Sequence, residues 1–190
     1  MQGKLIIISA PSGSGKSTII HAMEDRGNFE MKFSVSATNR SPREGEEHGV
    51  HYYFLTTEEF KDRIASGDFV EYEEVYPGRF YGTLKSEIDR RLAAGDNIVL
   101  DIDVNGGMNV KKQYGPQALS VFIMPPSVEA LRQRLVGRAT ESASRIDERL
   151  ARAEYEISVA DKFDRVVIND DLAAAVEATE GAILDFLGKQ

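Results

Sequence analysis

The stretch that decides the fold lies near the N-terminus, from Leu5 to Thr18, and reads LIIISAPSGSGKST. Its first part is a run of β-branched apolar residues, the pattern of a strand buried on both faces of a parallel sheet. A short run of Pro, Ser and Gly follows, and the sequence from Ser17 onward is typical of a helix. Strand, glycine-rich loop and helix in this order are the context in which G-x-x-x-x-G-K-[ST] predicts a phosphate-binding loop.

The glycines and the residues after them supply the groups that a bound triphosphate needs. Gly13 and Gly15 let backbone N–H groups turn inward around an anion, and the following helix directs its positive end at it. Lys16 places a positive charge on the β- and γ-phosphates, and the Ser17 hydroxyl can ligate Mg²⁺. The predicted triphosphate-binding residues are Ser12, Gly13, Ser14, Gly15, Lys16, Ser17 and Thr18. The alternative interpretation is a glycine-rich turn with a solvated lysine, and Ala10 replaces the first glycine of the pattern.

The composition is that of an ordinary globular protein. The 190 residues, 42% hydrophobic and 28% charged, suffice for one core with insertions. The absence of cysteine excludes a disulfide framework, a thiolate metal site and a cysteine nucleophile. A formal net charge of −8 argues against general nucleic-acid binding. No apolar run approaches the ~20 residues of a membrane helix, and the N-terminus lacks a signal-peptide pattern. We therefore expect a cytoplasmic protein with no membrane partner.

Strands and helices alternate along the chain, which predicts a three-layer α/β fold with a parallel sheet. Apolar runs predict strands at 5–9, 33–36, 98–103, 119–124 and 166–168, and helices are expected at 84–94, 128–136, 142–161 and 172–187. Thr57 is expected to cap a further helix, and Ser127 the helix that begins at Val128. The stretch 36–83 contains tyrosine-rich strands at 51–54 and 69–75 and an expected turn at 77–83. We interpret it as a small strand-rich insertion into the core.

Two arginines in the insertion are candidates for binding a phosphate. Arg40 and Arg43 flank Pro42 in a polar loop. A guanidinium fork suits bidentate contact with phosphate oxygens, and proline stiffens the loop that would present the pair. The alternative is a solvated loop in which the neighbouring glutamates are the partners of these arginines.

Two acidic residues follow the apolar run that begins at Ile98. Asp101 and Asp103 lie at its C-terminal end, and ligands of open parallel sheets sit outside the carboxyl ends of the strands. Carboxylates at this place can hold Mg²⁺ or its water molecules. The alternative is that each aspartate caps a helix or forms a salt bridge.

The segment 127–157 is rich in arginine and is interrupted by Gly137. Glutamates and aspartates are interspersed, so most of these arginines are expected in surface pairs on helices. Arginines lie on both sides of the interruption. An arginine on each side of a hinged segment is what a helical lid closing over phosphates needs.

Several motifs, in this order, resemble the guanylate kinase family of P-loop nucleoside monophosphate kinases. They are SAPSGSGKS (9–17), SVSATNRSPR (34–43), HYYF (51–54), FVEY (69–72), YGT (81–83), LDID (100–103) and VINDD (167–171). The resemblance covers nearly the whole chain. It implies reversible transfer of the ATP γ-phosphoryl group to GMP, and to dGMP, with Mg²⁺ as cofactor. It also implies one domain, 1–190, with a core (1–35, 84–126 and 158–190), a GMP-binding insertion (36–83) and a lid (127–157).

The resemblance assigns roles to individual residues. It places GMP on Ser36, Arg40, Arg43, Tyr52, Glu71, Tyr81, Thr83 and Asp101, and ATP on the residues from Ser12 to Thr18 with Asn169 beside the adenine. The implied catalytic residues are Lys16, Arg43, Arg138 and Arg149, and the implied metal site is Ser17 with Asp101 and Asp103 acting through water. Thr83 stands where the family often has serine, and Ala139 where the lid often has glycine.

Two other functions agree with parts of the sequence. A monophosphate kinase for another base would share the core and differ in the residues that contact the base, chiefly Glu71 and Ser36. A non-catalytic peptide-binding domain of the guanylate-kinase-like scaffold type would typically have a degraded ATP loop, whereas Lys16, Ser17 and the glycines are intact here.

Overall fold

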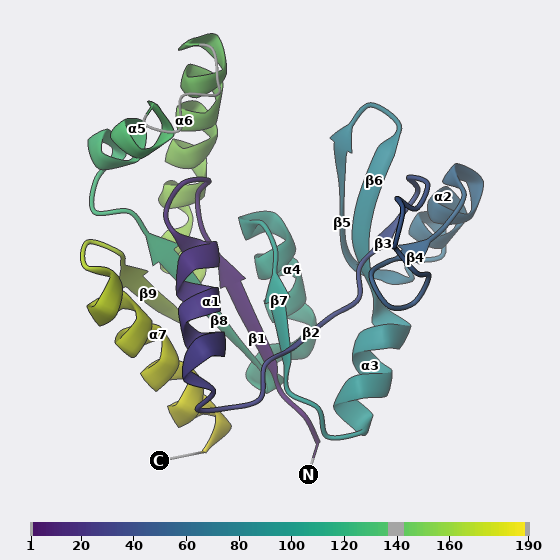
Figure 1. Ribbon diagram of the computed structural model, residues 1–190. Coiled ribbons are helices and arrows are strands. Elements are labelled where there is room, and N and C mark those ends of the chain that lie inside the picture. The colour runs from purple at the N-terminus through teal and green to yellow at the C-terminus, as the bar shows by residue number, and fades with distance from the viewer. Residues whose placement is uncertain (1, 137–142, 189–190) are drawn as a thin grey trace.

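The computed structural model of the chain describes residues 2–136 and 143–188 (Figure 1). Its main sheet has five strands in the order β2-β7-β1-β8-β9, and all of the pairings between them are parallel. The strands are β1 (Leu5–Ser9), β2 (Lys32–Phe33), β7 (Ile98–Asp101), β8 (Ala118–Met124) and β9 (Arg165–Ile168). Every residue of β1, the central strand, is buried, as its continuous apolar run predicts.

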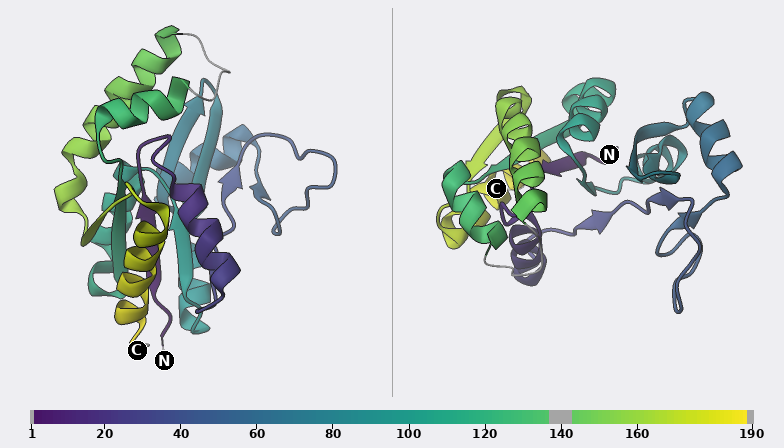
Figure 2. Two further views of the ribbon diagram at one scale, coloured as in Figure 1. Left: turned by 60° about the vertical axis from the view of Figure 1, so that its left-hand side comes forward. Right: turned by 90° about the horizontal axis from the view of Figure 1, so that it is seen from above.

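Helices cover both faces of this sheet, which confirms the predicted three-layer α/β fold (Figures 1 and 2). Alternate residues of β1 face opposite layers. Ile6 and Ile8 pack in the apolar cluster that includes α1 (Lys16–Arg26) and α7 (Leu172–Leu187). Leu5 and Ile7 pack in a second cluster, which includes residues of α3 (Lys85–Ala93) and α4 (Val104–Tyr114). Two single-turn 3-10 helices lie at Gly115–Gln117 and Ala160–Lys162. Within the described residues, no helix is long and apolar enough to cross a membrane.

A second, four-stranded sheet is formed by residues between Ala37 and Leu84, with the order β4-β3-β6-β5. Its strands are β3 (Ala37–Thr38), β4 (Tyr53–Phe54), β5 (Phe69–Tyr76) and β6 (Arg79–Leu84), and α2 (Thr57–Ala65) packs on it. The packing is aromatic, because Phe60 of α2 stacks on Phe69 and Phe80 with ring centroids 4.4 and 5.5 Å apart. This sheet therefore has a small core of its own.

Three expectations for this region were wrong in detail. The expected turn at 77–83 is mostly β6, which pairs antiparallel with β5, because the chain reverses in the two residues Pro77 and Gly78. Of the expected strand at 33–36, only Phe33 lies in a strand, at the end of β2, and residues 34–36 connect β2 to β3, which belongs to the other sheet. The cap of α2 is Thr56 rather than Thr57, because the Thr56 hydroxyl accepts from the Glu59 N–H at 3.1 Å and the Glu59 carboxylate accepts from the Thr56 N–H at 2.7 Å.

Helix α4 was not predicted. The apolar strand β7 ends at Asp101, and Asp103 caps α4 by accepting hydrogen bonds from the N–H groups of Asn105 at 2.7 Å and Gly106 at 3.1 Å. Two glycines inside the helix, Gly106 and Gly107, hide its pattern in the sequence. Both have a packing reason, since a Cβ on Gly106 would lie 3.3 Å from the Glu71 side chain and one on Gly107 would lie 2.9 Å from the Ser9 hydroxyl oxygen.

Helices α5 (Val128–Val136) and α6 (Ala143–Ser158) pack on each other through Leu131, Ile146, Leu150 and Ala153. Ser127 caps α5 as predicted, its hydroxyl accepting from the Ala130 N–H at 3.0 Å. The expected helix 142–161 ends earlier, at Ser158. Figure 1 shows α5 and α6 on one side and the β5–β6 hairpin on the other side of the edge at which β1 ends.

Candidate active site

The phosphate-binding loop connects β1 to α1. Gly13 and Gly15 have φ angles of 92° and 91°, in the left-handed region that favours glycine. Gly15 precedes the first residue of α1, and no side chain caps this helix end. The first N–H groups of α1 thus have no N-cap side chain as acceptor, so they can donate to a bound anion.

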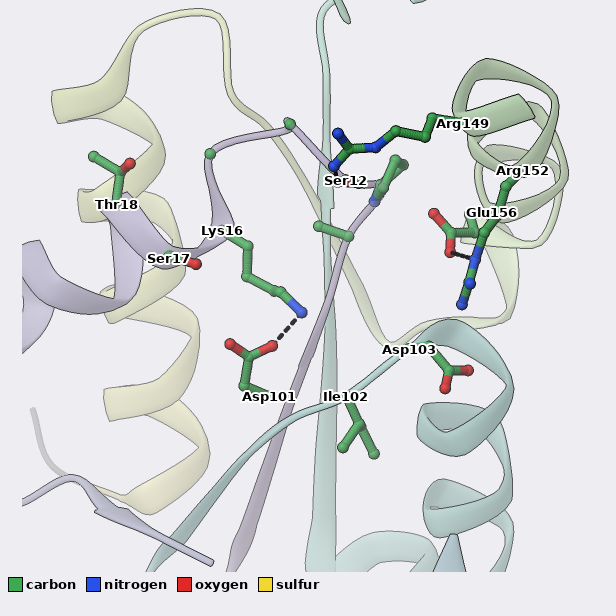
Figure 3. Close-up of a pocket in the computed structure, with 14 residues that line it drawn as sticks. Ser12, Lys16, Ser17, Thr18, Asp101, Ile102, Asp103, Arg149, Arg152 and Glu156 are labelled. Carbon is green, nitrogen blue, oxygen red and sulfur yellow. Dashed lines mark hydrogen bonds and ion pairs between the residues drawn. The ribbon is translucent and has the colours of Figure 1, made fainter. Parts of the chain in front are cut away.

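A cleft of about 510 Å³ lies in front of this loop (Figure 3). It is lined by most of the loop residues and by Asp101, Ile102, Asp103, Arg149, Arg152 and Glu156. The Lys16 ammonium forms an ion pair with the Asp101 carboxylate inside the cleft. The two aspartates predicted to hold a metal both have protein partners. Asp101 forms a salt bridge with Lys16 and Asp103 caps α4, which are the two roles that the alternative interpretation named.

The oxygen donors around Lys16 fit a magnesium ion bound together with a nucleotide. The Ser17 hydroxyl and the carboxylates of Asp101 and Asp103 line the same cleft. In residues 2–136 and 143–188, no cluster of three or more His, Cys, Asp or Glu is arranged to hold a metal by itself. Mg²⁺ keeps several waters and binds through one or two protein oxygens and the substrate phosphates.

Helix α6 contributes two arginines to the cleft. Arg149 donates a hydrogen bond to the Ser12 hydroxyl of the phosphate loop. Arg152 donates through Nε to the Glu156 carboxylate and through Nη2 to the Glu73 carboxylate of β5, both at 3.1 Å. Burial raises the pKa of Glu156, and the charge of Arg152 opposes this shift. Of the two predicted lid arginines, Arg149 therefore reaches the loop, and Arg138 lies outside the described residues.

Arg152 and Glu156 were not predicted from the sequence as residues of this cleft. Their i,i+4 spacing is that of a surface ion pair, and they do form one. The signal that could have identified Arg152 is its position three residues after Arg149, because this spacing places both arginines on one face of α6.

A further cavity, of about 440 Å³, lies on the other side of the phosphate loop. It is lined by Gly13, Gly15, Thr18, Arg134, Asn169, Asp170 and Leu172. In Figure 3 the Thr18 side chain points away from Lys16. The cavity contains Asn169, the residue expected beside the adenine, together with Arg134 of α5, which the sequence analysis did not single out.

A separate cleft of about 330 Å³ lies between the second sheet and α4. Glu71 of β5 lines it, and its carboxylate accepts a hydrogen bond from the Thr83 hydroxyl of β6 at 2.6 Å. Burial raises the pKa of Glu71 to about 7, aided by the negative charges of Asp103 and Glu73 and opposed by the Thr83 hydrogen bond. The structure thus places the Thr83 hydroxyl against Glu71, which lines this pocket.

The two predicted phosphate arginines of the insertion lie around a fourth opening, of about 480 Å³. The Arg40 guanidinium forms a bidentate pair with Glu46, with N···O distances of 2.6 and 2.7 Å, and its central carbon lies 5.0 Å from the Tyr52 ring centroid. This pairing raises the pKa of Arg40 and lowers that of Glu46 to about 2. Glu46 also accepts from the Arg43 backbone N–H at 2.7 Å. In this structure Arg40 therefore has a neighbouring glutamate as its partner, as the alternative interpretation of the loop predicted.

The remaining predicted residues of the insertion lie nearby. The rings of Tyr52 and Tyr81 meet edge to face with centroids 6.0 Å apart. Ser36 precedes β3 and accepts a hydrogen bond through its carbonyl oxygen from the Tyr53 N–H at 2.8 Å. Tyr81 and Thr83 are alternate residues of β6, which places them on the same face of the strand.

The clefts adjoin each other. Asp103 lines both the cleft of the phosphate loop and the cleft of Glu71. The ion pair between Arg152 and Glu73 joins α6 to β5 beside the same boundary. The cleft of the phosphate loop thus shares a wall with the pocket that contains the Glu71 carboxylate.

A parallel sheet with a glycine-rich loop between its central strand and the first helix defines a P-loop nucleotide-binding protein of the α/β class. Residues 2–185 match the family described as guanylate kinase. The chain belongs to the guanylate kinase family. It is 55% identical over 190 residues to the guanylate kinase of Bacteroides thetaiotaomicron, covering 100% of this chain and 93% of that one.

Further relatives agree with this membership. The guanylate kinase of Bacteroides fragilis is 54% identical over 187 residues, which covers 98% of this chain and 91% of the relative. The crystal structure of guanylate kinase from Anaplasma phagocytophilum superposes with a TM-score of 0.67 at 29% identity, over 97% of this chain and 86% of that chain.

Proposed function

We propose that this protein is a guanylate kinase, which transfers the γ-phosphoryl group of ATP to GMP and gives ADP and GDP. The observation that carries the proposal is the shared wall at Asp103 between the phosphate-loop cleft and the pocket of Glu71 and Thr83. This arrangement would hold a triphosphate donor and a guanine-bearing acceptor side by side. Membership of the guanylate kinase family indicates ATP and GMP as the two substrates.

The Glu71 pocket supports guanine as the base. Guanine presents two adjacent donors, its N1–H and its exocyclic amine, and an ionised carboxylate accepts from both. Adenine has an unprotonated N1 and no amine at C2, so Glu71 would face a lone pair without a partner. A site built on hydrogen bonds rejects an analogue that lacks them, because its buried polar groups stay unpaired. The Thr83 hydroxyl, 2.6 Å from the Glu71 carboxylate, orients this acceptor.

The cations around the clefts support phosphoryl transfer between two polyanions. Lys16 pairs with Asp101, Arg40 with Glu46, and Arg149 with the Ser12 hydroxyl. We infer that bound phosphates take over these contacts. The acceptor is a phosphate with a second pKa of about 6, so it is mostly dianionic at neutral pH and needs no general base. Catalysis is then positioning plus neutralisation of charge.

The remaining residues predicted from the sequence keep their proposed roles. The GMP-binding set is Ser36, Arg40, Arg43, Tyr52, Glu71, Tyr81, Thr83 and Asp101, and Arg43, Arg138 and Arg149 join Lys16 as catalytic residues. We propose that the Ser17 hydroxyl would hold Mg²⁺ directly, and that Asp101 and Asp103 would hold it through water. The ion would neutralise phosphate charge when bound with ATP.

The proposed division of the chain follows from these roles. The insertion 36–83 would close on GMP, and the lid 127–157 would close on ATP, so that water is kept from the γ-phosphate. We place the protein in the cytoplasm, where both nucleotides occur.

A coupled assay for ADP formation tests the function. With ATP and Mg²⁺, we expect turnover with GMP and dGMP, and kcat/KM values for AMP, CMP and UMP lower by orders of magnitude. Preference for another monophosphate would indicate a kinase for a different base. Absence of turnover with every acceptor, together with peptide binding, would indicate the scaffold alternative.

The raised pKa of Glu71 predicts a pH dependence. Because this pKa is about 7 and guanine requires the ionised carboxylate, GMP binding below pH 7 must first remove a proton. We expect kcat/KM for GMP to fall by up to about tenfold per pH unit as the pH drops below 7. At saturating GMP, kcat should stay flat over this range, because the bound donors keep Glu71 ionised.

Steady-state kinetics between pH 5.5 and 8.5 would measure this profile. Glu71→Gln is the matched variant, since its amide does not ionise. In its pH profile of kcat/KM, only the decrease caused by protonation of the GMP phosphate near pH 6 should remain. A wild-type kcat/KM that is constant from pH 8 to 6.5 would contradict the prediction.

A further inference from the structure

Asn169 is a buried polar residue at the carboxyl end of β9, with 6% of its surface exposed. Its backbone is held from two sides. The Asn169 N–H donates to the Met124 carbonyl of β8 at 2.8 Å, and the Asn169 carbonyl accepts from Nη2 of Arg134 at 3.1 Å. These two hydrogen bonds hold the Asn169 backbone in place beside the phosphate loop.

The Asn169 side chain contacts the backbone of that loop. Its Nδ2 donates a buried hydrogen bond to the Ser14 carbonyl oxygen at 2.7 Å, across 155 residues of sequence. The orientation of the amide follows from chemistry, because a carbonyl oxygen can only accept and the nitrogen must therefore face it. A Cβ on Gly15 would lie 2.3 Å from the same Nδ2, so the contact requires glycine at this position.

This hydrogen bond determines the direction of one peptide group in the loop. The Ser14 carbonyl and the Gly15 N–H belong to the same planar trans peptide, in which C=O and N–H point in opposite directions. With the carbonyl directed at Asn169, the Gly15 N–H must point away from Asn169. A phosphate-binding loop works by directing such N–H groups at the anion. Rotation of this peptide would present a carbonyl oxygen to the phosphates instead.

We propose that Asn169 is a positioning residue for the phosphate loop, which holds the Ser14–Gly15 peptide in the orientation that binds the nucleotide's phosphates. The proposal rests on the proposed kinase function for the identity of the bound nucleotide, the phosphoryl donor ATP. It differs from an adenine contact in one consequence: the loss of the hydrogen bond should weaken binding of every triphosphate, whether or not it carries a base.

Asn169→Asp tests the proposal, because it is nearly isosteric and its carboxylate cannot donate to the Ser14 carbonyl. The probe is inorganic tripolyphosphate with Mg²⁺, titrated calorimetrically, alongside ATP. We expect both affinities to fall by a similar factor, about tenfold or more, as for a buried acceptor that loses its donor. Asn97→Asp is the control for added charge, since the Asn97 side chain accepts from the Lys4 N–H far from the loop and an aspartate keeps this role.

A pH profile supplies a second readout that a merely structural role would not change. Protonation of the variant's carboxyl restores a donor, so its kcat/KM for ATP relative to wild type should rise toward acidic pH. Weakened ATP binding with unchanged tripolyphosphate binding would overturn the proposal in favour of an adenine contact. Unchanged binding of both probes would also overturn it. Should the aspartate variant fail to fold by circular dichroism, Asn169→Ala removes the bond without adding charge and gives the same comparison.

Tripolyphosphate binding separates this proposal from the proposed function. A wild-type protein that binds tripolyphosphate but does not phosphorylate GMP would contradict the assigned reaction and leave the role of Asn169 testable by the same titration.

Discussion

Replacing Lys16 by methionine is expected to lower kcat by at least about 10³-fold while the protein stays folded. Lys16 begins α1, and its ammonium lies in the cleft of the phosphate loop, where the β- and γ-phosphates of ATP are proposed to bind. Methionine has a similar length and no charge. The negative charge that develops during transfer would then lack its nearest fixed cation.

The fold should tolerate this change, because the ion pair that Lys16 forms with Asp101 is partly exposed. The side chains of Lys16 and Asp101 are 20% and 39% exposed, and ion pairs at such exposure contribute at most about 1 kcal/mol to stability. Asp101 can rehydrate when the lysine is lost.

ADP formation at saturating ATP and GMP, together with thermal unfolding, would measure the effect of Lys16→Met. Lys112→Met is the matched control, because Lys112 is exposed on α4 and lines none of the clefts described above. We expect this control to keep wild-type turnover. A Lys16→Met protein with both melting temperature and turnover near wild type would show that Lys16 does not act on the phosphates.

Glu71→Ala is expected to reduce kcat/KM for GMP by at least about 100-fold, the loss of two charge-assisted hydrogen bonds at ~1.5–3 kcal/mol each. The Glu71 carboxylate lines its pocket and accepts a hydrogen bond from the Thr83 hydroxyl at 2.6 Å. AMP makes neither hydrogen bond, so its kcat/KM should change little. The GMP/AMP ratio should therefore narrow through the loss of GMP activity rather than through a gain for AMP.

Steady-state kinetics with both nucleotides decides this prediction. Glu177→Ala, which removes an exposed carboxylate from α7, controls for the change in net charge. Removal of Glu71 also relieves a buried carboxylate, so the variant is expected to be as stable as wild type or more stable at neutral pH. An unchanged GMP/AMP ratio would show that Glu71 does not read the base.

The central part of the fold could be predicted from local sequence. The apolar run of β1, the glycines of the loop and the start of α1 follow one another without a gap, and each element follows from its own residues. The caps of α5 and α7 also lie next to the helices they begin. Helix α4 escaped prediction because Gly106 and Gly107 weaken its pattern, and the reason for both glycines is a neighbour in space.

The second sheet shows where the local pattern was insufficient. Pro77 and Gly78 indicate a turn, and the residues after them were assigned to it. Their pairing with β5 makes them a strand, and strand pairing depends on a partner elsewhere in the chain.

The sequence by itself determined the class of the core, the phosphate loop and the candidate residues, because these depend on residue types at short, fixed spacings. Only the tertiary structure decided which of these residues meet. Lys16 pairs with Asp101, Arg152 with Glu73, 79 residues away, and Asn169 with Ser14, 155 residues away. The physical reason for the first and the last of these contacts is that they require the strand order of the main sheet, which places β1 between β7 and β8 and brings β9 beside the loop. Strand order follows from packing of the whole chain, and no short stretch of sequence records it.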